Sequence, residues 1–192
     1  MEFIVIGVGV SIFGIQHSGL SSLRVKNYII DRWGKSGYAN IFKATSIITL
    51  VIAGLTMWGS DWLYFASSPE IVNILLVSCG AILILISAVL ARAAARVISV
   101  TTVADMRTDR MPELVTDGIY SRIRHPLYLA TVLMLMGLAL LYPFPRVIAF
   151  SLGMIFYTLI GSILEERKLI HHYGRAYLEY KKQAGFILPK IR

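Results

Sequence analysis

The chain of 192 residues is 56% hydrophobic and only 16% charged, with a formal net charge of +8 at pH 7. Soluble domains are usually about 45–50% apolar, so this composition and the mean hydropathy of +0.68 exclude an ordinary soluble domain and indicate a polytopic membrane protein. The positive charge does not indicate a nucleic-acid partner, because such binding needs a soluble basic face and the sequence offers none. The first residues carry no basic region and no cleavage site of small residues, which predicts a retained helix.

Five hydrophobic segments predict an all-α fold with five transmembrane helices. A helix crosses a bilayer with about 20 apolar residues, and only the fourth segment is clearly shorter than this. Pro143 and Pro145 separate the fourth segment from the fifth and predict a tight reversal, so the two segments should form an antiparallel hairpin. The five segments cover residues 3–23, 41–59, 71–91, 127–142 and 146–164.

Lysine and arginine are unevenly distributed between these segments. All of them except Arg146 lie at or near the loop between the first two segments, in the connection 92–125, or in the C-terminal region. The positive-inside rule places these regions in the cytoplasm, so the N-terminus is expected outside and the C-terminus inside. Apolar and aromatic residues at helical spacing, Leu169, Tyr173, Tyr177 and Tyr180, predict an amphipathic helix over 165–182 against the cytoplasmic face.

A polar cluster, Arg124-His125-Pro126-Leu127-Tyr128, stands immediately before the fourth segment. Pro126 suits the first turn of a helix, and the free N–H groups of that turn are a natural seat for a carboxylate or phosphate. His125 and Arg124 add side-chain donors, and Tyr128 adds an aromatic face and a hydroxyl. The alternative is an ordinary membrane-interface belt, in which arginine meets lipid phosphate and tyrosine lies at head-group level.

A pair of acidic residues, Glu165-Glu166, follows the fifth segment directly. Acidic groups at the C-terminal end of a helix oppose its dipole, and one explanation is a pair of surface ion pairs with Arg122 or Arg124. Because the fourth and fifth segments are antiparallel, however, both clusters should meet at one membrane face. A pocket with both polarities could hold a zwitterion that carries a sulfonium or ammonium centre.

Other kinds of site have weak support in the sequence. His171 and His172 are adjacent and point about 100° apart on a helix, and no other histidine or cysteine stands at ligand spacing, so no metal site is expected. Glycine-rich phosphate loops, nucleophile elbows and dinucleotide-binding fingerprints are absent from the sequence.

Taken in order over about residues 110–190, several blocks together resemble the isoprenylcysteine carboxyl methyltransferases. These enzymes belong to a wider membrane methyltransferase group that includes phospholipid N-methyltransferases. The blocks are Leu114-Val115-Thr116, Gly118-Ile119-Tyr120, Arg124-His125-Pro126 with Tyr128, Glu165-Glu166 with Leu169, Tyr173-Gly174 with Tyr177 and Tyr180, and Leu188-Pro189.

The resemblance implies that S-adenosylmethionine is the cofactor and S-adenosylhomocysteine its product. Residues 1–100 would then supply three transmembrane helices, and residues 101–192 would form the cofactor-binding region with two more helices and the amphipathic tail. His125, Tyr128 and the helix start would hold the amino-acid end or the adenosine, and Glu165 the ribose or ammonium. The implied cofactor-binding residues are Leu114, Val115, Tyr120, His125, Pro126, Leu127, Tyr128 and Glu165.

Arg124 and Glu166 are the expected catalytic residues, with Arg124 or another arginine of the cytoplasmic side positioning an anionic acceptor. The chain departs from the eukaryotic members of the family at Gly161, where they have an arginine implicated in substrate contact. Asp105 also stands where they have glutamine, and Met111-Pro112-Glu113 stands where they have Thr-His-Thr. The residues for the methyl donor are therefore better matched than those for the acceptor.

We expect an integral, multi-pass membrane enzyme that methylates a lipidated or lipid acceptor, foremost the C-terminal carboxylate of a prenylcysteine. The first alternative is a phospholipid ethanolamine N-methyltransferase. An NADPH-dependent membrane reductase is a second, because sterol reductases carry a similar Arg-His-Pro-x-Tyr segment, but those enzymes are much longer. A non-enzymatic lipid-binding membrane protein is a third.

Overall fold

The computed structural model describes residues 1–60, 63–64, 71–97 and 114–190, and within these ranges the protein contains helices and no strand. Four helices are long and apolar enough to cross a membrane, whereas α6 is shorter. Asp105 and the segment Met111-Pro112-Glu113 lie outside the described residues. The helices are α1 (Glu2–Ser21), α2 (Leu23–Leu55), α4 (Ile71–Val97), the 3₁₀ helix η1 (Gly118–Ser121), α6 (Pro126–Leu141), α7 (Pro145–Tyr173) and α8 (Arg175–Gln183).

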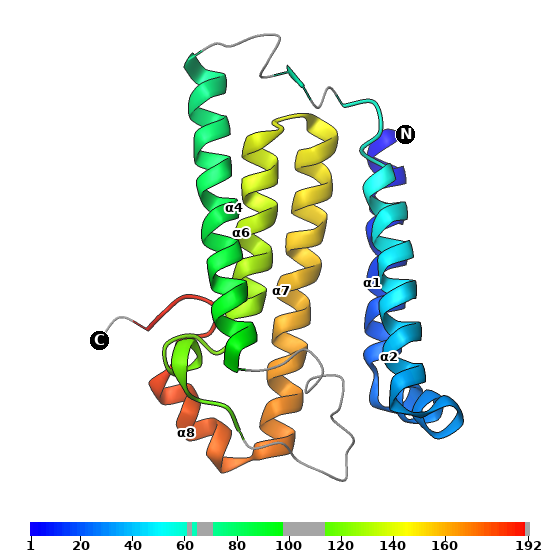
Figure 1. The fold of residues 1–192 in the computed structure, drawn as a ribbon, viewed down its shortest axis with the longest axis vertical. Coiled ribbons are helices and arrows are strands. Elements are labelled where there is room, and N and C mark those ends of the chain that lie inside the picture. Colours follow the sequence, from blue (N-terminus) through cyan, green and yellow to red (C-terminus); the bar gives the residue numbers. More distant parts are fainter. Residues whose placement is uncertain (61–62, 65–70, 98–113, 191–192) are drawn as a thin grey trace.

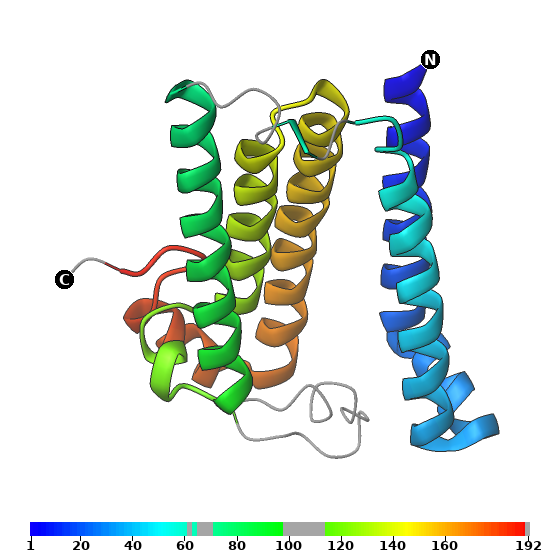
Figure 2. The same cartoon turned by 45° about the horizontal axis from the view of Figure 1, so that its top comes forward.

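Helices α4, α6 and α7 lie side by side, and α1 and α2 form a second pair beyond α7 (Figures 1 and 2). Their common core contains Ile6, Ala53, Leu135 and Phe150, from α1, α2, α6 and α7 respectively. Helix α8 lies at the end of the molecule where α4 and α7 finish (Figure 1). All-helical architecture is therefore confirmed for the described residues, while the number of spans and their orientation stay predictions.

The expected loop between the first two segments is wrong, because the residues from Leu23 onward already belong to α2. Gly34 has a φ of 71° and a ψ of 174°, which divides α2 into a first part, residues 23–33, and a second part, residues 35–55. Ile29 and Ile30 in the first part are buried against Tyr38. The charged residues on the exposed face of the first part lower its hydropathy, so hydropathy alone did not predict this helix.

Helices α4 and α6 cross at two glycines. A Cβ atom on Gly80 would lie 2.7 Å from the Gly137 carbonyl oxygen, and one on Gly137 would lie 2.8 Å from the Gly80 oxygen. Nearer the start of α6, the buried Ser87 hydroxyl donates a hydrogen bond of 2.7 Å to the Ala130 carbonyl. The absence of side chains at the crossing allows the two backbones to touch, which fixes α6 against α4.

The reversal between α6 and α7 is confirmed, since α6 ends at Leu141 and α7 begins at Pro145. Contrary to the prediction, the helix does not end where the fifth apolar segment ends, because α7 continues past residue 164 to Tyr173. Gly174, with a φ of 55°, separates α7 from α8. The predicted amphipathic helix over 165–182 is therefore two helices, and the two glutamates lie inside α7, two turns before its end.

Candidate active site

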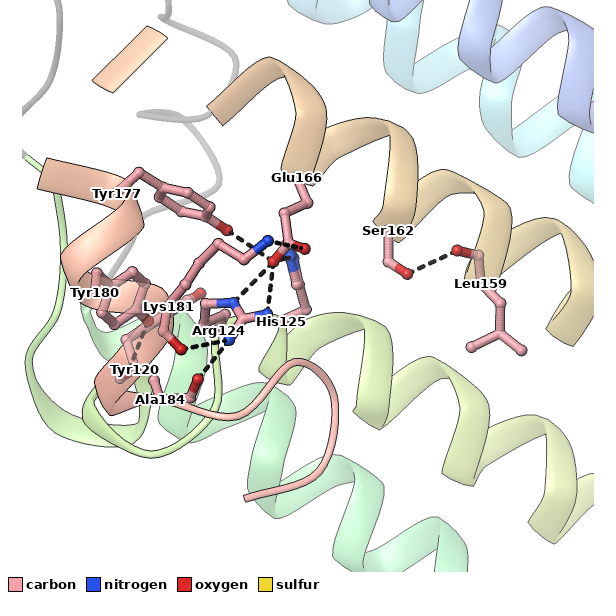
Figure 3. Close-up of polar contacts among 10 residues, drawn as sticks. All are labelled: Tyr120, Arg124, His125, Leu159, Ser162, Glu166, Tyr177, Tyr180, Lys181 and Ala184. Carbon is pink, nitrogen blue, oxygen red and sulfur yellow. Dashed lines mark hydrogen bonds and ion pairs between the residues drawn. The ribbon is translucent and has the colours of Figure 1, made fainter. Parts of the chain in front are cut away.

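A buried ion-pair centre joins the start of α6 to α7 and α8 (Figure 3). The Arg124 guanidinium donates from Nε to Oε1 of Glu166 at 2.8 Å, and its Nη2 lies 2.8 Å from the same oxygen. Lys181 Nζ is 3.0 Å from Oε2 of Glu166, and the Tyr177 hydroxyl donates to Oε1 at 3.4 Å. Only 8% of the Arg124 side chain and 15% of the Glu166 side chain are exposed, so the two charges neutralise each other largely away from water.

The C-terminal segment 184–186 completes this centre by pairing with the backbone that precedes α6. Arg124 N donates to Gly185 O at 2.8 Å, His125 N donates to Phe186 O at 3.1 Å, and Gly185 N donates to Arg122 O at 2.9 Å. The Arg124 side chain also donates from Nη1 to the carbonyl of Ala184. The guanidinium is therefore held between α7, α8 and this segment.

His125 is the N-cap residue of α6, and its side chain is only 4% exposed. Its ring contacts Tyr128 and Phe186 edge-on, with centroid distances of 5.5 and 5.0 Å. The ring Nε2 is buried without a hydrogen-bond partner and lies 3.8 Å from Glu166 Oε1. Burial, aided by the nearby Arg124 charge, outweighs the attraction of Glu166 and lowers the pKa of His125 to about 4, so the imidazole is neutral at pH 7.

Glu166 stays ionised. We take the membrane-spanning part of α7 as the apolar residues 146–164, which end before this residue. Burial by itself raises the pKa of Glu166, but hydrogen bonds from Lys181 and Arg124, together with their charges, lower it below its ordinary value. A carboxylate whose oxygens already accept from these donors has little basicity left for proton transfer.

Glu165 has a different environment, although it is the next residue. It is half-buried, and its carboxylate forms no hydrogen bond or ion pair within the part of the chain that the structure describes. Gly161 lies one turn earlier on α7, and a Cβ atom there would be 3.5 Å from Cε1 of Tyr128. The Tyr128 ring thus faces Gly161 with room for one methyl group between them, one turn before Glu165 on α7.

The remaining predicted site residues lie in two other places. Tyr120 is buried behind the ion-pair centre, where its carbonyl accepts from the Tyr180 hydroxyl at 2.6 Å (Figure 3). Leu114 packs on the cluster formed by Tyr177, Tyr180 and Ala184, and Val115 beside it is half-buried. Pro126 is fully buried, whereas Leu127 is exposed on α6.

The structure therefore brings Arg124, His125, Tyr128 and the two glutamates to the junction of α6 and α7. It adds two residues that sequence reasoning did not assign to the site, Lys181 and Phe186. Lys181 follows Tyr177 by four residues, so the helical spacing of the tyrosines could have placed it on the same face of α8. Phe186 reaches His125 only through backbone pairing distant in sequence, for which no pattern exists.

Chemically, the junction offers a neutral imidazole and a carboxylate, Glu165, neither of which has a hydrogen-bond partner among residues 1–60, 63–64, 71–97 and 114–190. It also offers the first-turn N–H groups of α6, which have no partner inside the helix. Such a set suits a polar ligand with both anionic and cationic groups. The described residues contain no group of three or more histidine, cysteine or acidic residues that could hold a metal ion.

Comparison with known proteins identifies relatives of this region. A family model described as phospholipid methyltransferase matches residues 75–176, from α4 to the start of α8. A methanethiol S-methyltransferase from Pseudomonas deceptionensis is 31% identical over 81 residues, which is 40% of this chain and 29% of that protein. The match thus covers less than a third of the length of that relative. No solved structure matches the chain significantly.

Proposed function

Since the chain belongs to the phospholipid methyltransferase family, matched over residues 75–176, we propose that it is an integral membrane methyltransferase that takes its methyl group from S-adenosylmethionine. Family membership also confirms the wider methyltransferase group indicated by the sequence motifs. The observation that carries the cofactor proposal is the buried Nε2 of His125, which has no hydrogen-bond partner among the described residues, beside the half-buried carboxylate of Glu165 at the α6–α7 junction.

Four groups of the protein would hold the cofactor. The His125 imidazole, neutral at pH 7, and the first-turn N–H groups of α6 would receive its carboxylate or adenine. Glu165 would receive the ribose hydroxyls or the ammonium group, and Tyr128 would cover one side. When bound, S-adenosylmethionine supplies an electrophilic methyl carbon on a sulfonium, to which the acceptor's electron pair bonds as the carbon–sulfur bond breaks.

Arg124 and Glu166 serve in this proposal as positioning residues. Glu166 and the carbonyls of Lys181 and Ala184 already accept hydrogen bonds from the Arg124 guanidinium. The ion pair between Arg124 and Glu166 therefore fixes the start of α6 relative to α7 and α8. This keeps the distance between His125 and Glu165 constant. Direct contact between Arg124 and an anionic acceptor stays a prediction of the sequence.

For the acceptor, we propose a lipid or lipidated molecule, foremost a prenylcysteine carboxylate. The family description favours a phospholipid amine as the second candidate, and the methanethiol S-methyltransferase relative adds a small thiol. A carboxylate acceptor is already ionised, whereas an amine acceptor must first lose a proton. The Glu165 carboxylate, which has no partner among the described residues, could accept that proton. The active site would lie on the cytoplasmic side, as the distribution of basic residues predicts.

Isothermal titration of the detergent-solubilised protein with S-adenosylhomocysteine tests the cofactor proposal. We expect binding to the wild type, weakened binding to His125→Ala and Glu165→Ala, and unchanged binding to Glu179→Ala, which removes an exposed carboxylate of α8. A wild type that binds NADPH and not S-adenosylhomocysteine would instead support a reductase. Labelled S-adenosylmethionine offered with prenylcysteines, phosphatidylethanolamine and methanethiol would then identify the acceptor class.

A further inference from the structure

The first part of α2, residues 23–33, forms a separate short helix that we call the interfacial helix. Its end is set by Gly34, whose φ of 71° breaks the helical path before the second part of α2 begins. In Figures 1 and 2 this part of the chain turns away from the axis of the rest of α2, at the end of the molecule where α8 lies. It therefore stands directly beside the membrane-crossing part of α2.

One side of the interfacial helix is anchored to the protein. Ile29 and Ile30 are buried with Tyr38, and the Tyr38 hydroxyl donates to the Leu20 carbonyl at 3.2 Å. Lys26 is only 5% exposed, and its Nζ lies 5.7 Å from the centre of the Tyr38 ring. These contacts hold the helix against the end of α1 and the start of the second part of α2.

The opposite side of the interfacial helix is exposed, basic and aromatic. Arg24, Tyr28 and Arg32 follow each other at intervals of four residues and share this face, and all three are exposed. Trp33 falls outside this row by helical spacing, but it is 54% exposed at the end of the helix, and the Arg32 guanidinium carbon lies 5.5 Å from the centre of its ring. The exposed Asp31 lies on the same face and is the one acidic residue of the segment, so two arginines against one carboxylate leave the face with a positive charge.

We propose that this exposed face binds the phosphate groups of anionic phospholipids in the adjacent leaflet. Arginine pairs with phosphate through two parallel hydrogen bonds, and tryptophan and tyrosine prefer the head-group level of a bilayer. Gly34 joins the helix to the second part of α2, in which the apolar segment begins at residue 41, so the arginines lie about two turns or more before that segment, on its head-group side. The charge of the face complements the negative surface of a cytoplasmic leaflet, and the site is separate from the α6–α7 junction.

Fluorescence quenching by brominated lipids tests this proposal in reconstituted bilayers. Trp58→Phe with Trp62→Phe leaves Trp33 as the single reporter, and brominated phosphatidylglycerol is compared with brominated phosphatidylcholine at equal mole fraction. Each basic residue near the surface favours anionic lipid by roughly fivefold at most. We expect Trp33 to be quenched more strongly by the phosphatidylglycerol lipid, and the preference to fall towards one in Arg24→Gln with Arg32→Gln.

Two controls separate this face from general charge attraction. Lys168→Gln with Arg175→Gln removes two exposed positive charges elsewhere, and the preference at Trp33 should persist. A variant that retains only the exposed Trp58, near the other end of α2, should be quenched equally by both lipids. Equal quenching of Trp33 by both lipids, or a preference that the Arg24 and Arg32 changes leave intact, would overturn the proposal.

Discussion

The Tyr128 ring faces Gly161 across the α6–α7 junction with room for a methyl group between them, because a Cβ atom on that glycine would be 3.5 Å from Cε1 of the ring, an ordinary van der Waals distance. Gly161 lies one turn before Glu165 on α7. A side chain larger than a methyl group at this position would reach the ring, so substitution of Gly161 tests what the junction binds.

Gly161→Ala should leave the site intact, since the added methyl group would be in ordinary van der Waals contact with Tyr128. Gly161→Leu should displace the Tyr128 ring, at a cost of about 1–3 kcal/mol for overpacking, and weaken S-adenosylhomocysteine binding measured by calorimetry. Gly153→Ala, at another α7 glycine with a similar contact to Val10, is the control. Equal affinities of the leucine variant and the wild type would contradict a cofactor seat at Tyr128.

Arg124→Gln should destabilise the protein by about 3 kcal/mol, because removal of one partner leaves the largely buried Glu166 short of a positive charge. Arg124→Lys should recover part of that loss, since lysine restores the charge but not the fork of donors. The measurement is the thermal unfolding temperature in detergent. Lys182→Gln, which breaks an exposed pair with Glu179, should change stability by less than about 0.5 kcal/mol; a similar loss in both variants would refute a special role of Arg124.

Acid should destabilise the protein through His125. The pKa of His125 is lowered to about 4 in the folded protein, so the unfolded chain binds a proton more readily. The contribution of the neutral imidazole is present above about pH 6.5 and is lost as the pH falls towards 4, by up to about 3 kcal/mol. His125→Phe should therefore flatten the dependence of unfolding temperature on pH over this range, whereas the exposed His171→Phe should not.

The α4–α6 crossing should not tolerate a side chain. Gly137→Ala would place a methyl group 2.8 Å from the Gly80 oxygen and 2.8 Å from Cγ1 of Ile84, so the helices must separate at a cost of about 1–3 kcal/mol. Gly54→Ala in α2 meets nothing within 4 Å and should be neutral or stabilising, as alanine favours a helix over glycine by about 1 kcal/mol. Thermal unfolding of both variants checks this, and equal behaviour would argue against a close crossing.

Several elements of the fold could be predicted because the chemistry that specifies them is local. Pro126 and Pro145 begin helices in the structure, as their missing N–H groups favour. Hydropathy, in contrast, marks where a segment leaves the lipid and not where its helix ends. This is why α7 runs through Glu165 and Glu166 to Tyr173, although the apolar residues stop at Leu164.

The sequence predicted most residues of the candidate site, but it predicted few of the contacts between them. The approach of Arg124 and Glu166 followed from the antiparallel hairpin. The pairing of Phe186 with His125 could not, because it is formed by backbone groups that any residue supplies. The different environments of Glu165 and Glu166 could not be predicted either. Adjacent residues on a helix point about 100° apart, and only the packing of α8 decides which of the two is paired.

The segment 184–186 has a consequence for the order in which the protein is made. The partners of Arg124 lie 42 residues later, at Glu166, and 60 residues later, at Ala184. During synthesis, α6 and α7 can therefore enter the membrane while Arg124 and His125 still lack the backbone that covers them. Assembly of this region waits for residues 184–186 to emerge, so a ribosome that stalls before residue 184 would leave inserted helices with an unfinished site.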